Sequence, residues 1–269
     1  PDAYGYIVRM FNGDNISYAL GDASTAYCGI SNIRLWKRSF EKYHLTQTPE
    51  NGFGETPLKK YRRHIFLLHP NKVVIYDELE ANEKVRWDWL LHSPVKFDIN
   101  PTASILTTVN KEKGFSSVVQ LFCEQEAAIT QTDKYAAPPN HADAQRGEDF
   151  TDPWSLTASF GPSRNNRILT IIQVEADGRQ AVQIMREGNT FRCGEWVIEA
   201  ELNAKRPGRL YIRNSRNNAV FSYGDKKPEI NGELYSCKEK DASVLFDCVN
   251  GEWMVQEMGD QRVQTMGKW

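Results

Sequence analysis

The stretch YRRHIFLLHPNKVVIYDELEANEKVRWDWLLHSP, Tyr61 to Pro94, decides the fold class. Short apolar runs alternate in it with polar turn segments. Residues 69–72 (HPNK) form a turn, because proline presets the second turn position and asparagine tolerates the third. Short connections between apolar runs predict an antiparallel meander in a large sheet. The expected order is a strand at His64–Leu68, this turn, a strand at Val73–Tyr76, a turn at Ala81–Glu83 and a strand at Val85–His92.

Strand-like runs continue through the rest of the chain, separated by Gly, Asn, Asp and Pro. Asn250-Gly251 between two such runs is the clearest signal for a tight hairpin. Since the chain shows no long amphipathic helical pattern, we expect an all-β fold of the sandwich type. The further expected strands are Tyr4–Met10, Val118–Cys123, Arg167–Gln173, Ala181–Met185, Glu195–Leu202, Arg209–Arg213, Ala219–Tyr223, Ser243–Cys248 and Glu252–Gln256.

Composition narrows the classes of function. Of the 269 residues 40% are hydrophobic and 25% charged, as in an ordinary globular protein, and the net charge is −2. No basic field points to nucleic acid or to an anionic membrane surface, so neither is an expected partner. No apolar run approaches the roughly 20 residues of a membrane-spanning helix. A strand already under way at Tyr4–Met10 suggests a mature or shortened chain.

The chain is long enough for one large β domain or two smaller ones. A long polar loop runs from Tyr135 to Pro153, and loops of that length are usually functional or mobile. The turn Ala176-Asp177-Gly178 is a candidate boundary. We therefore expect a large antiparallel sandwich in residues 1–175, with residues 176–269 as its continuation or as a smaller C-terminal sandwich.

Five cysteines are widely spaced and include no CxxC pair, so the sequence carries no zinc knuckle or thioredoxin-like motif. Cys237 and Cys248 flank one expected hairpin and are the candidates for a disulfide. The alternative is five buried thiols. The five residues are Cys28, Cys123, Cys193, Cys237 and Cys248.

The order of landmarks resembles a known family. An arginine precedes an apolar strand, a proline-containing turn follows, then a Val-Val-Ile-x-Asp strand, then a tryptophan-rich strand that ends at His92. This order resembles the β-sheet part of heparinase II/III-type polysaccharide lyases. Further similar landmarks extend the resemblance over about residues 16–175: Tyr18–Tyr27, Gln131–Lys134, Asp152–Ala158 and Arg167–Gln173.

The resemblance implies a large supersandwich and a role in eliminative cleavage of uronic-acid polysaccharides. That reaction needs a base for the C5 proton, a group that neutralises the uronate and an acid for the leaving oxygen. In the family a helical toroid supplies a Tyr and an Asn or His. The start of the β domain supplies a further His, beside a zinc site in many members. The β-domain signatures, His-x-His and an Asp-x-Gly-Ser-Phe-like run, are missing from this sequence.

We therefore interpret the chain as the C-terminal β-sandwich of such a lyase, without catalytic residues of its own and inactive alone. It would support a missing N-terminal toroid and one wall of the glycan cleft. The implied partners are an acidic polysaccharide and that toroid. No metal or cofactor is expected in this chain, and any zinc belongs to the missing part of the parent protein. The implied location is secreted or periplasmic.

Aromatic and basic clusters supply the candidate glycan contacts. An exposed aromatic ring can stack on a sugar, and guanidinium groups make charge-assisted hydrogen bonds to acidic groups. The ordinary alternatives are a solvated strand entry for the basic run Lys59–Arg63 and surface chance for the others. Trp87, Trp89 and Trp154 fit core positions instead. The candidates are Trp36, Arg38, His44, Arg62 and Arg63.

Two other readings stay open. A stand-alone carbohydrate-binding or adhesion module would show no large apolar surface but would bind glycan by itself. A complete hydrolase would need paired carboxylates, and the densest acidic cluster is Asp77, Glu78 and Glu80, at an expected strand end where carboxylates are usually solvated. The lyase fragment instead predicts a large apolar surface where the toroid docks.

Overall fold

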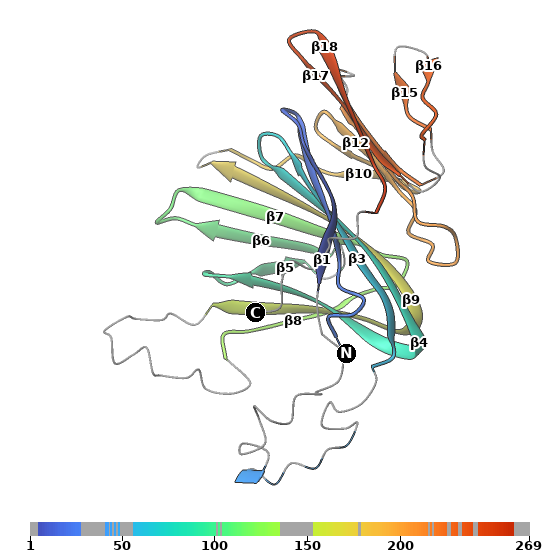
Figure 1. Ribbon diagram of the computed structural model, residues 1–269. Helices are drawn as coiled ribbons and strands as arrows, with labels where there is room; N and C mark the ends of the chain where they lie inside the picture. The colour runs from blue at the N-terminus through green and yellow to red at the C-terminus, as the bar shows by residue number, and fades with distance from the viewer. Residues whose placement is uncertain are drawn as a thin grey trace.

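A computed structural model describes residues 5–27, 41–42, 44, 46, 48, 56–100, 102, 104–134, 153–176, 179–214, 216, 218–224, 227–230, 233–238 and 242–260. Most of these residues lie in antiparallel strands (Figure 1). The expected all-β class is confirmed. The strands form one nine-stranded sheet, one seven-stranded sheet and one small hairpin.

The nine-stranded sheet has the order β1-β2-β3-β4-β9-β7-β6-β5, with β8 paired to β9. The meander expected around residue 70 is its centre, where β3 turns into β4 and Leu68 pairs with Lys72. All of its pairings are antiparallel. Its strands are β1 (Tyr6–Asn12), β2 (Ile16–Asp22), β3 (Leu58–Leu68), β4 (Lys72–Ser93), β5 (Asp98–Asn100), β6 (Ile105–Asn110), β7 (Phe115–Phe122), β8 (Ala128–Thr132) and β9 (Trp154–Ala176).

The turn expected at Ala81–Glu83 is wrong. β4 continues through it, because β9 is an equally long partner that pairs with β4 on both sides of this point. The pairing register shifts between Glu80 and Val85 and again between Val85 and Trp87. Opposite, Gly161 has φ +106°, and a Cβ there would lie 2.9 Å from Ser163 N and 3.0 Å from Val85 O. The polar residues thus mark a bend, at which β4 and β9 curve together and the sheet folds over on itself (Figure 1).

The two halves of the bent sheet enclose a hydrophobic core. Trp87 and Trp89 from the second half of β4 pack in this core with Leu121 and Ile168. Both tryptophans are buried, as the sequence predicts, and Trp154 is half-buried against the same cluster. His92 faces solvent near the end of β4.

The seven-stranded sheet has the order β10-β11-β12-β13-β14-β17-β18. The strand expected at 181–185 is wrong except for its last residue. The side chain of Gln173 instead makes two hydrogen bonds to the backbone of Val182, at 2.9 and 3.1 Å. The strands are β10 (Met185–Glu187), β11 (Thr190–Cys193), β12 (Trp196–Ala200), β13 (Leu210–Asn214), β14 (Ala219–Tyr223), β17 (Ser243–Val249) and β18 (Glu252–Met258), with β15 (Glu229–Ile230) and β16 (Glu233–Leu234) as a separate hairpin.

The hairpin expected at Asn250-Gly251 is confirmed. Both residues have positive φ, 53° and 85°, as a tight hairpin turn requires. Val249 pairs with Glu252 across the turn.

A second, larger core lies between the two sheets. Tyr18, Phe66 and Tyr76 of the nine-stranded sheet belong to the same buried cluster as Trp196 and Phe221 of the seven-stranded sheet. The chain passes from one sheet to the other between Ala176, the end of β9, and Met185, the start of β10. The second sheet therefore covers one face of the first, and we call the opposite face of β1–β4 the outer face.

The four described cysteines are free thiols, including the pair considered at Cys237 and Cys248. Cys193 is buried and the other three are half-buried, so the description as buried thiols is right only for Cys193. Cys28 lies outside the described residues.

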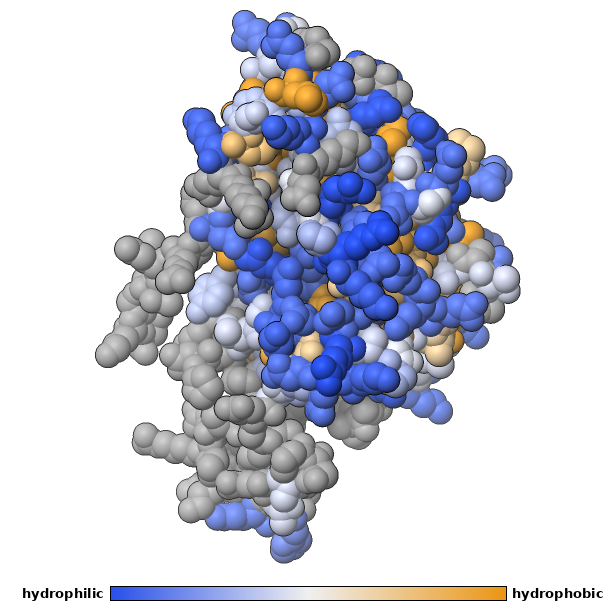
Figure 2. Space-filling view, turned by 90° about the vertical axis from the view of Figure 1, so that its right-hand side faces the viewer, coloured by the Kyte–Doolittle hydropathy of each residue, from blue (hydrophilic) through white to orange (hydrophobic). Residues whose placement is uncertain are grey.

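On the side drawn in Figure 2, the coloured residues are mainly hydrophilic and the hydrophobic ones form small separate groups. Among the described residues no helix has the length and apolar character needed to cross a membrane.

Candidate functional site

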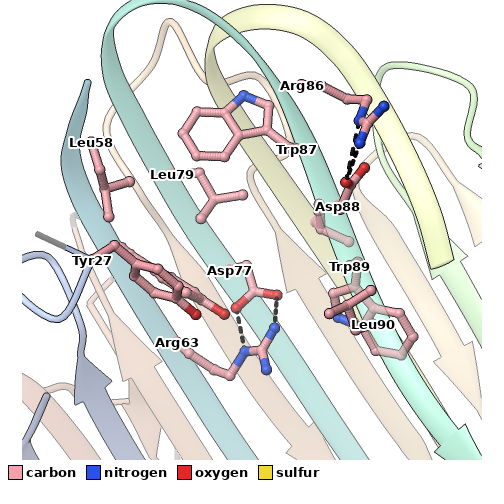
Figure 3. A pocket seen from close by; sticks show the side chains of 12 residues that line it. Tyr27, Leu58, Arg63, Asp77, Leu79, Arg86, Trp87, Asp88, Trp89 and Leu90 are labelled. Carbon is pink, nitrogen blue, oxygen red and sulfur yellow. Dashed lines mark hydrogen bonds and ion pairs between the residues drawn. The ribbon is translucent and has the colours of Figure 1, made fainter. Parts of the chain in front are cut away.

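A hollow lies at the open edge between the two halves of the bent sheet (Figure 3). Its volume is about 340 Å³. One wall comes from β3 and the first half of β4, and the other from the second half of β4. Among the described residues, the second half of β4 pairs only with β9, so its other edge is unpaired. Side chains from both faces of the strand therefore reach the hollow along this edge, for example Asp88 and Trp89.

The strand register explains which side chains line the first wall. Alternate residues of a strand point to opposite faces, so Tyr61 and Arg63 lie on the outer face while Arg62 and His64 point toward the second sheet. Arg63 pairs directly with Asp77 across the β3–β4 ladder. These two side chains are therefore neighbours on one face.

Arg63 and Asp77 form a bidentate ion pair at the base of the hollow. Nε donates to Oδ1 at 2.7 Å and Nη2 donates to Oδ2 at 2.9 Å. Asp77 is 1% exposed, and burial raises the pKa of its carboxyl although Arg63 acts in the opposite direction. Burial would lower the pKa of Arg63, but Asp77 outweighs it and the pKa is raised, so the guanidinium stays charged.

Two tyrosines form an aromatic rim beside this pair. The rings of Tyr27 and Tyr61 are stacked, with centroids 5.7 Å apart and an interplanar angle of 29°. The guanidinium carbon of Arg63 lies 5.6 Å from the Tyr61 centroid. Burial, with a smaller contribution from Asp77, raises the pKa of Tyr61 to about 12, so its hydroxyl remains a hydrogen-bond donor.

A second ion pair lines the opposite wall. Arg86 donates to Asp88 Oδ2 from Nη2 at 2.9 Å and from Nε at 3.2 Å. The other carboxylate oxygen of Asp88 accepts from Ser159 Oγ at 2.7 Å. Figure 3 shows this pair and the Arg63–Asp77 pair on different sides of the hollow.

The two tryptophans of this wall differ in their hydrogen bonding. Trp87 Nε1 donates to the backbone oxygen and the hydroxyl of Ser163, at 3.2 and 3.1 Å. Trp89 Nε1 is buried and has no partner among the described residues. In Figure 3 this nitrogen lies on the indole edge toward the Arg63–Asp77 pair. Buried N–H groups are rarely left unpaired, so this donor is an exception that needs an explanation.

A second hollow of about 310 Å³ adjoins the first between β1, β2 and β3, and it shares Tyr27, Tyr61 and Arg63 with it. Beyond it the outer face is apolar. Met10, Ile65 and Leu67 are 62%, 41% and 38% exposed and occupy neighbouring register rows.

The acidic cluster at 77–80 is not a solvated strand end, which corrects the expectation. Because β4 continues, Asp77 and Glu78 lie inside a strand and point to opposite faces, and both are buried. Glu78 lies between the two sheets, whereas Glu80 is paired with Lys59 at 2.7 Å. The described residues hold no group of three or more His, Cys, Asp or Glu side chains arranged to bind a metal.

Of the five expected glycan contacts, the structure assigns Arg63 to the hollow. Arg62 points to the other face, where it is paired with Asp22 and Asp260. His44 is exposed and has φ 52°. Trp36 and Arg38 lie outside the described residues, and their glycan contacts stay predictions.

The sequence reasoning missed Tyr27, Tyr61 and Asp77 as site residues. A signal for Asp77 was present: in a hairpin closed by Leu68 and Lys72, residues equally distant from the turn pair, which makes Arg63 and Asp77 partners. Arg86 and Asp88 carry no such signal, since their position depends on the bend.

No protein-family model matches this chain, and no curated protein matches it. Solved structures of heparinase-type lyases are similar in fold. Heparan sulfate lyase HepC from Pedobacter heparinus is 8% identical over 86% of this chain and 27% of its own, with a TM-score of 0.47. A heparinase III gene product is 11% identical over 78% and 26%, with a TM-score of 0.47. Another heparinase III is 12% identical over 86% and 26%, with a TM-score of 0.44. The chain thus spans about a quarter of the length of these proteins and is similar to a β region of them.

Proposed function

We propose that this chain is the C-terminal β-sandwich part of a heparinase II/III-like polysaccharide lyase that acts by β-elimination on uronic-acid glycans. In this proposal it forms one wall of the glycan cleft and supports a helical toroid that the sequence does not contain. The sequence landmarks that resemble the family fall largely on β2, β3, β4 and β9, which are consecutive neighbours in the sheet. With an extended polymer as partner, the proposed location is secreted or periplasmic.

The observation that carries the proposal is the exposed apolar outer face beside the hollow. Ile7, Met10, Ile65 and Leu67 expose large aliphatic side chains there. Contiguous exposed apolar surface marks interaction sites, because its burial is worth roughly 25 cal/mol per Å². A lyase fragment predicts such a surface for its toroid, whereas a free-standing module predicts none.

The two buried carboxylates of the acidic cluster at 77–80 support a non-catalytic role. Both oxygens of Asp77 accept from Arg63, and Glu78 is buried between the sheets. Neither carboxylate is open to a substrate proton, as a general acid or base must be. The hollow, with its tyrosines and ion pairs, is suited to contact a glycan without cleaving it.

The alternative is a stand-alone carbohydrate-binding module, which the Tyr27–Tyr61 rim favours. Two measurements test the proposal, and the second separates it from this alternative. The first is unsaturated-uronate absorbance with the isolated chain on heparin, heparan sulfate, chondroitin, hyaluronan and alginate, for which we expect no turnover. Turnover by the isolated chain would overturn the proposal.

The second measurement is the change in melting temperature that Leu67→Lys causes in the isolated chain and in the full-length parent protein. If the toroid covers the outer face, the substitution lowers the melting temperature of the full-length protein much more than that of the isolated chain. Leu234→Lys is the matched control, since Leu234 is 67% exposed in the separate β15–β16 hairpin. Equal effects of Leu67→Lys in both proteins would favour the stand-alone module.

A further inference from the structure

We propose that the hollow between β3 and the second half of β4 binds an uncharged pyranose ring, and not a uronate or sulfated ring. The binding of such a ring follows from the hollow itself; that the ring belongs to an acidic polysaccharide rests on the proposed function. The volume of about 340 Å³ lies at the lower end of the range for small-molecule sites, roughly 300–1,000 Å³, and suits a single sugar unit.

The charges of the hollow cancel within it. Its two arginines are each bound to an aspartate, Arg63 to Asp77 and Arg86 to Asp88. An anionic sugar would have to compete with a carboxylate already in place, and it would meet Asp88 on one wall and Asp77 on the other. An uncharged ring meets no such competition.

The same pairs offer the hydrogen bonds that sugar hydroxyls need. A carboxylate accepts through several lone pairs and a guanidinium donates through five N–H groups, so a bidentate pair leaves capacity on both partners. A vicinal diol can donate to the carboxylate of Asp88 and accept from the guanidinium of Arg86. Asp88 is the more accessible acceptor, because its side chain is 31% exposed.

Aromatic side chains supply the apolar contact. Tyr27 is 57% exposed and stacks on Tyr61 at the rim. The axial C–H face of a pyranose is apolar and can pack on such a ring, while its hydroxyls point outward to polar partners. The hollow thus has the usual composition of a ligand site, aromatic with a few convergent polar groups.

Trp89 gives an independent observation. Its indole N–H is buried and has no partner in the described part of the chain, whereas the N–H of Trp87 two residues away is fully used by Ser163. An unsatisfied buried donor costs about 1–3 kcal/mol. A ring hydroxyl bound in the hollow would supply the acceptor that Trp89 lacks.

The test uses the chain labelled with ¹⁵N and two probes, the methyl glycosides of N-acetylglucosamine and of glucuronic acid. Tryptophan-to-phenylalanine variants assign the indole signals. We expect the uncharged glycoside to shift the Trp89 indole signal more than that of Trp87. Its affinity should exceed that of the glucuronide by at least about tenfold and should change little between low and high salt.

Two variants sharpen the test. Tyr27→Ala should weaken binding about tenfold or more, whereas Tyr27→Phe, which keeps the ring, should not. Tighter, salt-sensitive binding of the glucuronide would overturn the inference, and so would a silent Trp89 with both probes. If a polymer binds while Trp89 stays silent, the inference fails and the proposed function stands. If the uncharged glycoside binds as expected but the isolated chain shows turnover, the inference stands and the proposed function fails.

Discussion

His64 Nε2 lies 3.3 Å from Glu78 Oε1 in the core between the two sheets, where both side chains are almost fully buried. Tyr223 also donates its hydroxyl to the same oxygen at 2.8 Å. Burial would raise the pKa of Glu78, but His64 and Lys60 outweigh it and hold the pKa well below its usual range. An ionised carboxylate is therefore built into the sandwich interior.

The rest of the network accommodates a neutral His64. Arg9 donates to Ser243 Oγ at 2.9 Å, Ser243 lies 3.2 Å from the Tyr18 hydroxyl, and that hydroxyl lies 3.0 Å from His64 Nδ1. All donors align if Ser243 donates to Tyr18, Tyr18 donates to Nδ1, and Nε2–H donates to Glu78. This arrangement corresponds to a neutral imidazole, in agreement with the lowering of the His64 pKa by burial.

The neutral His64 predicts a loss of stability in mild acid. Burial lowers its pKa below the ordinary value of about 6.5, although Glu78 acts in the opposite direction. The unfolded chain therefore binds more protons below pH ~6.5, and the free energy of unfolding falls there by up to about 1.4 kcal/mol per pH unit. The charged and titratable groups around His64 are Glu78, Tyr18, Tyr76, Tyr223, Arg9 and Arg62.

Urea unfolding between about pH 8 and about pH 5 measures this slope. His64→Gln should flatten it, and His92→Gln, at an exposed position, should leave it unchanged. An NMR titration of His64 gives a second readout that does not depend on a variant. A slope equal in His64→Gln and in the unaltered chain would contradict the prediction.

Gly208 is predicted to tolerate no side chain. The carboxylate of Glu78 packs directly on it, so a Cβ would overlap the carboxylate oxygens. Gly208→Ala should lower the free energy of unfolding by about 1–3 kcal/mol, the usual cost of overpacking. The control is Gly21→Ala, whose nearest atoms lie 3.9 Å away. Chemical denaturation of both variants checks the difference, and equal stabilities would show that Glu78 can move aside.

Local sequence patterns predicted many of the strands but not the bend. Trp87 and Trp89 alternate with exposed residues, so their burial could be read from the sequence. The continuation of β4 could not, because the residues at 81–83 have ordinary turn chemistry. Pairing with β9, about eighty residues later in the chain, decides their conformation.

The residues of the hollow also fall into a group that the sequence could predict and a group that it could not. Arg63 and Asp77 follow from the alternation of β3 and the position of one turn. The wall formed by Arg86 and Asp88 depends on the bend near Gly161, where two distant strands curve together. Sequence alone also treated Arg62 and Arg63 as one basic run, whereas the period of a strand puts them on opposite faces.

Gly251 is predicted to be required by the β17–β18 hairpin. Its φ of 85° is unfavourable for any residue with a Cβ, so Gly251→Ala should cost about 1–2 kcal/mol even though nothing lies within 4 Å. Asn250→Gly keeps a residue that accepts positive φ and should change stability by no more than a few tenths of a kcal/mol. Thermal unfolding of the two variants makes the comparison. An unaffected Gly251→Ala would mean that the turn can change type.

Arg62 and Arg63 give the sharpest contrast in the cost of losing an ion pair. Arg63→Met leaves Asp77, 1% exposed, as an unpaired buried charge, and should cost about 3 kcal/mol or more. Arg62→Met removes pairs to Asp22 and Asp260, which water still reaches, and should cost about 1 kcal/mol or less.

The double variant Arg63→Met/Asp77→Leu tests the cause. If the cost arises from the stranded carboxylate, replacing Asp77 as well should recover most of it, because a hydrophobic pair of similar volume fills the same space. Chemical denaturation of the single and double variants provides the cycle. Should the double variant stay as unstable as Arg63→Met, the loss would come from the contact of the guanidinium with the Tyr61 ring, and the ion pair would be less important to the fold than its burial indicates.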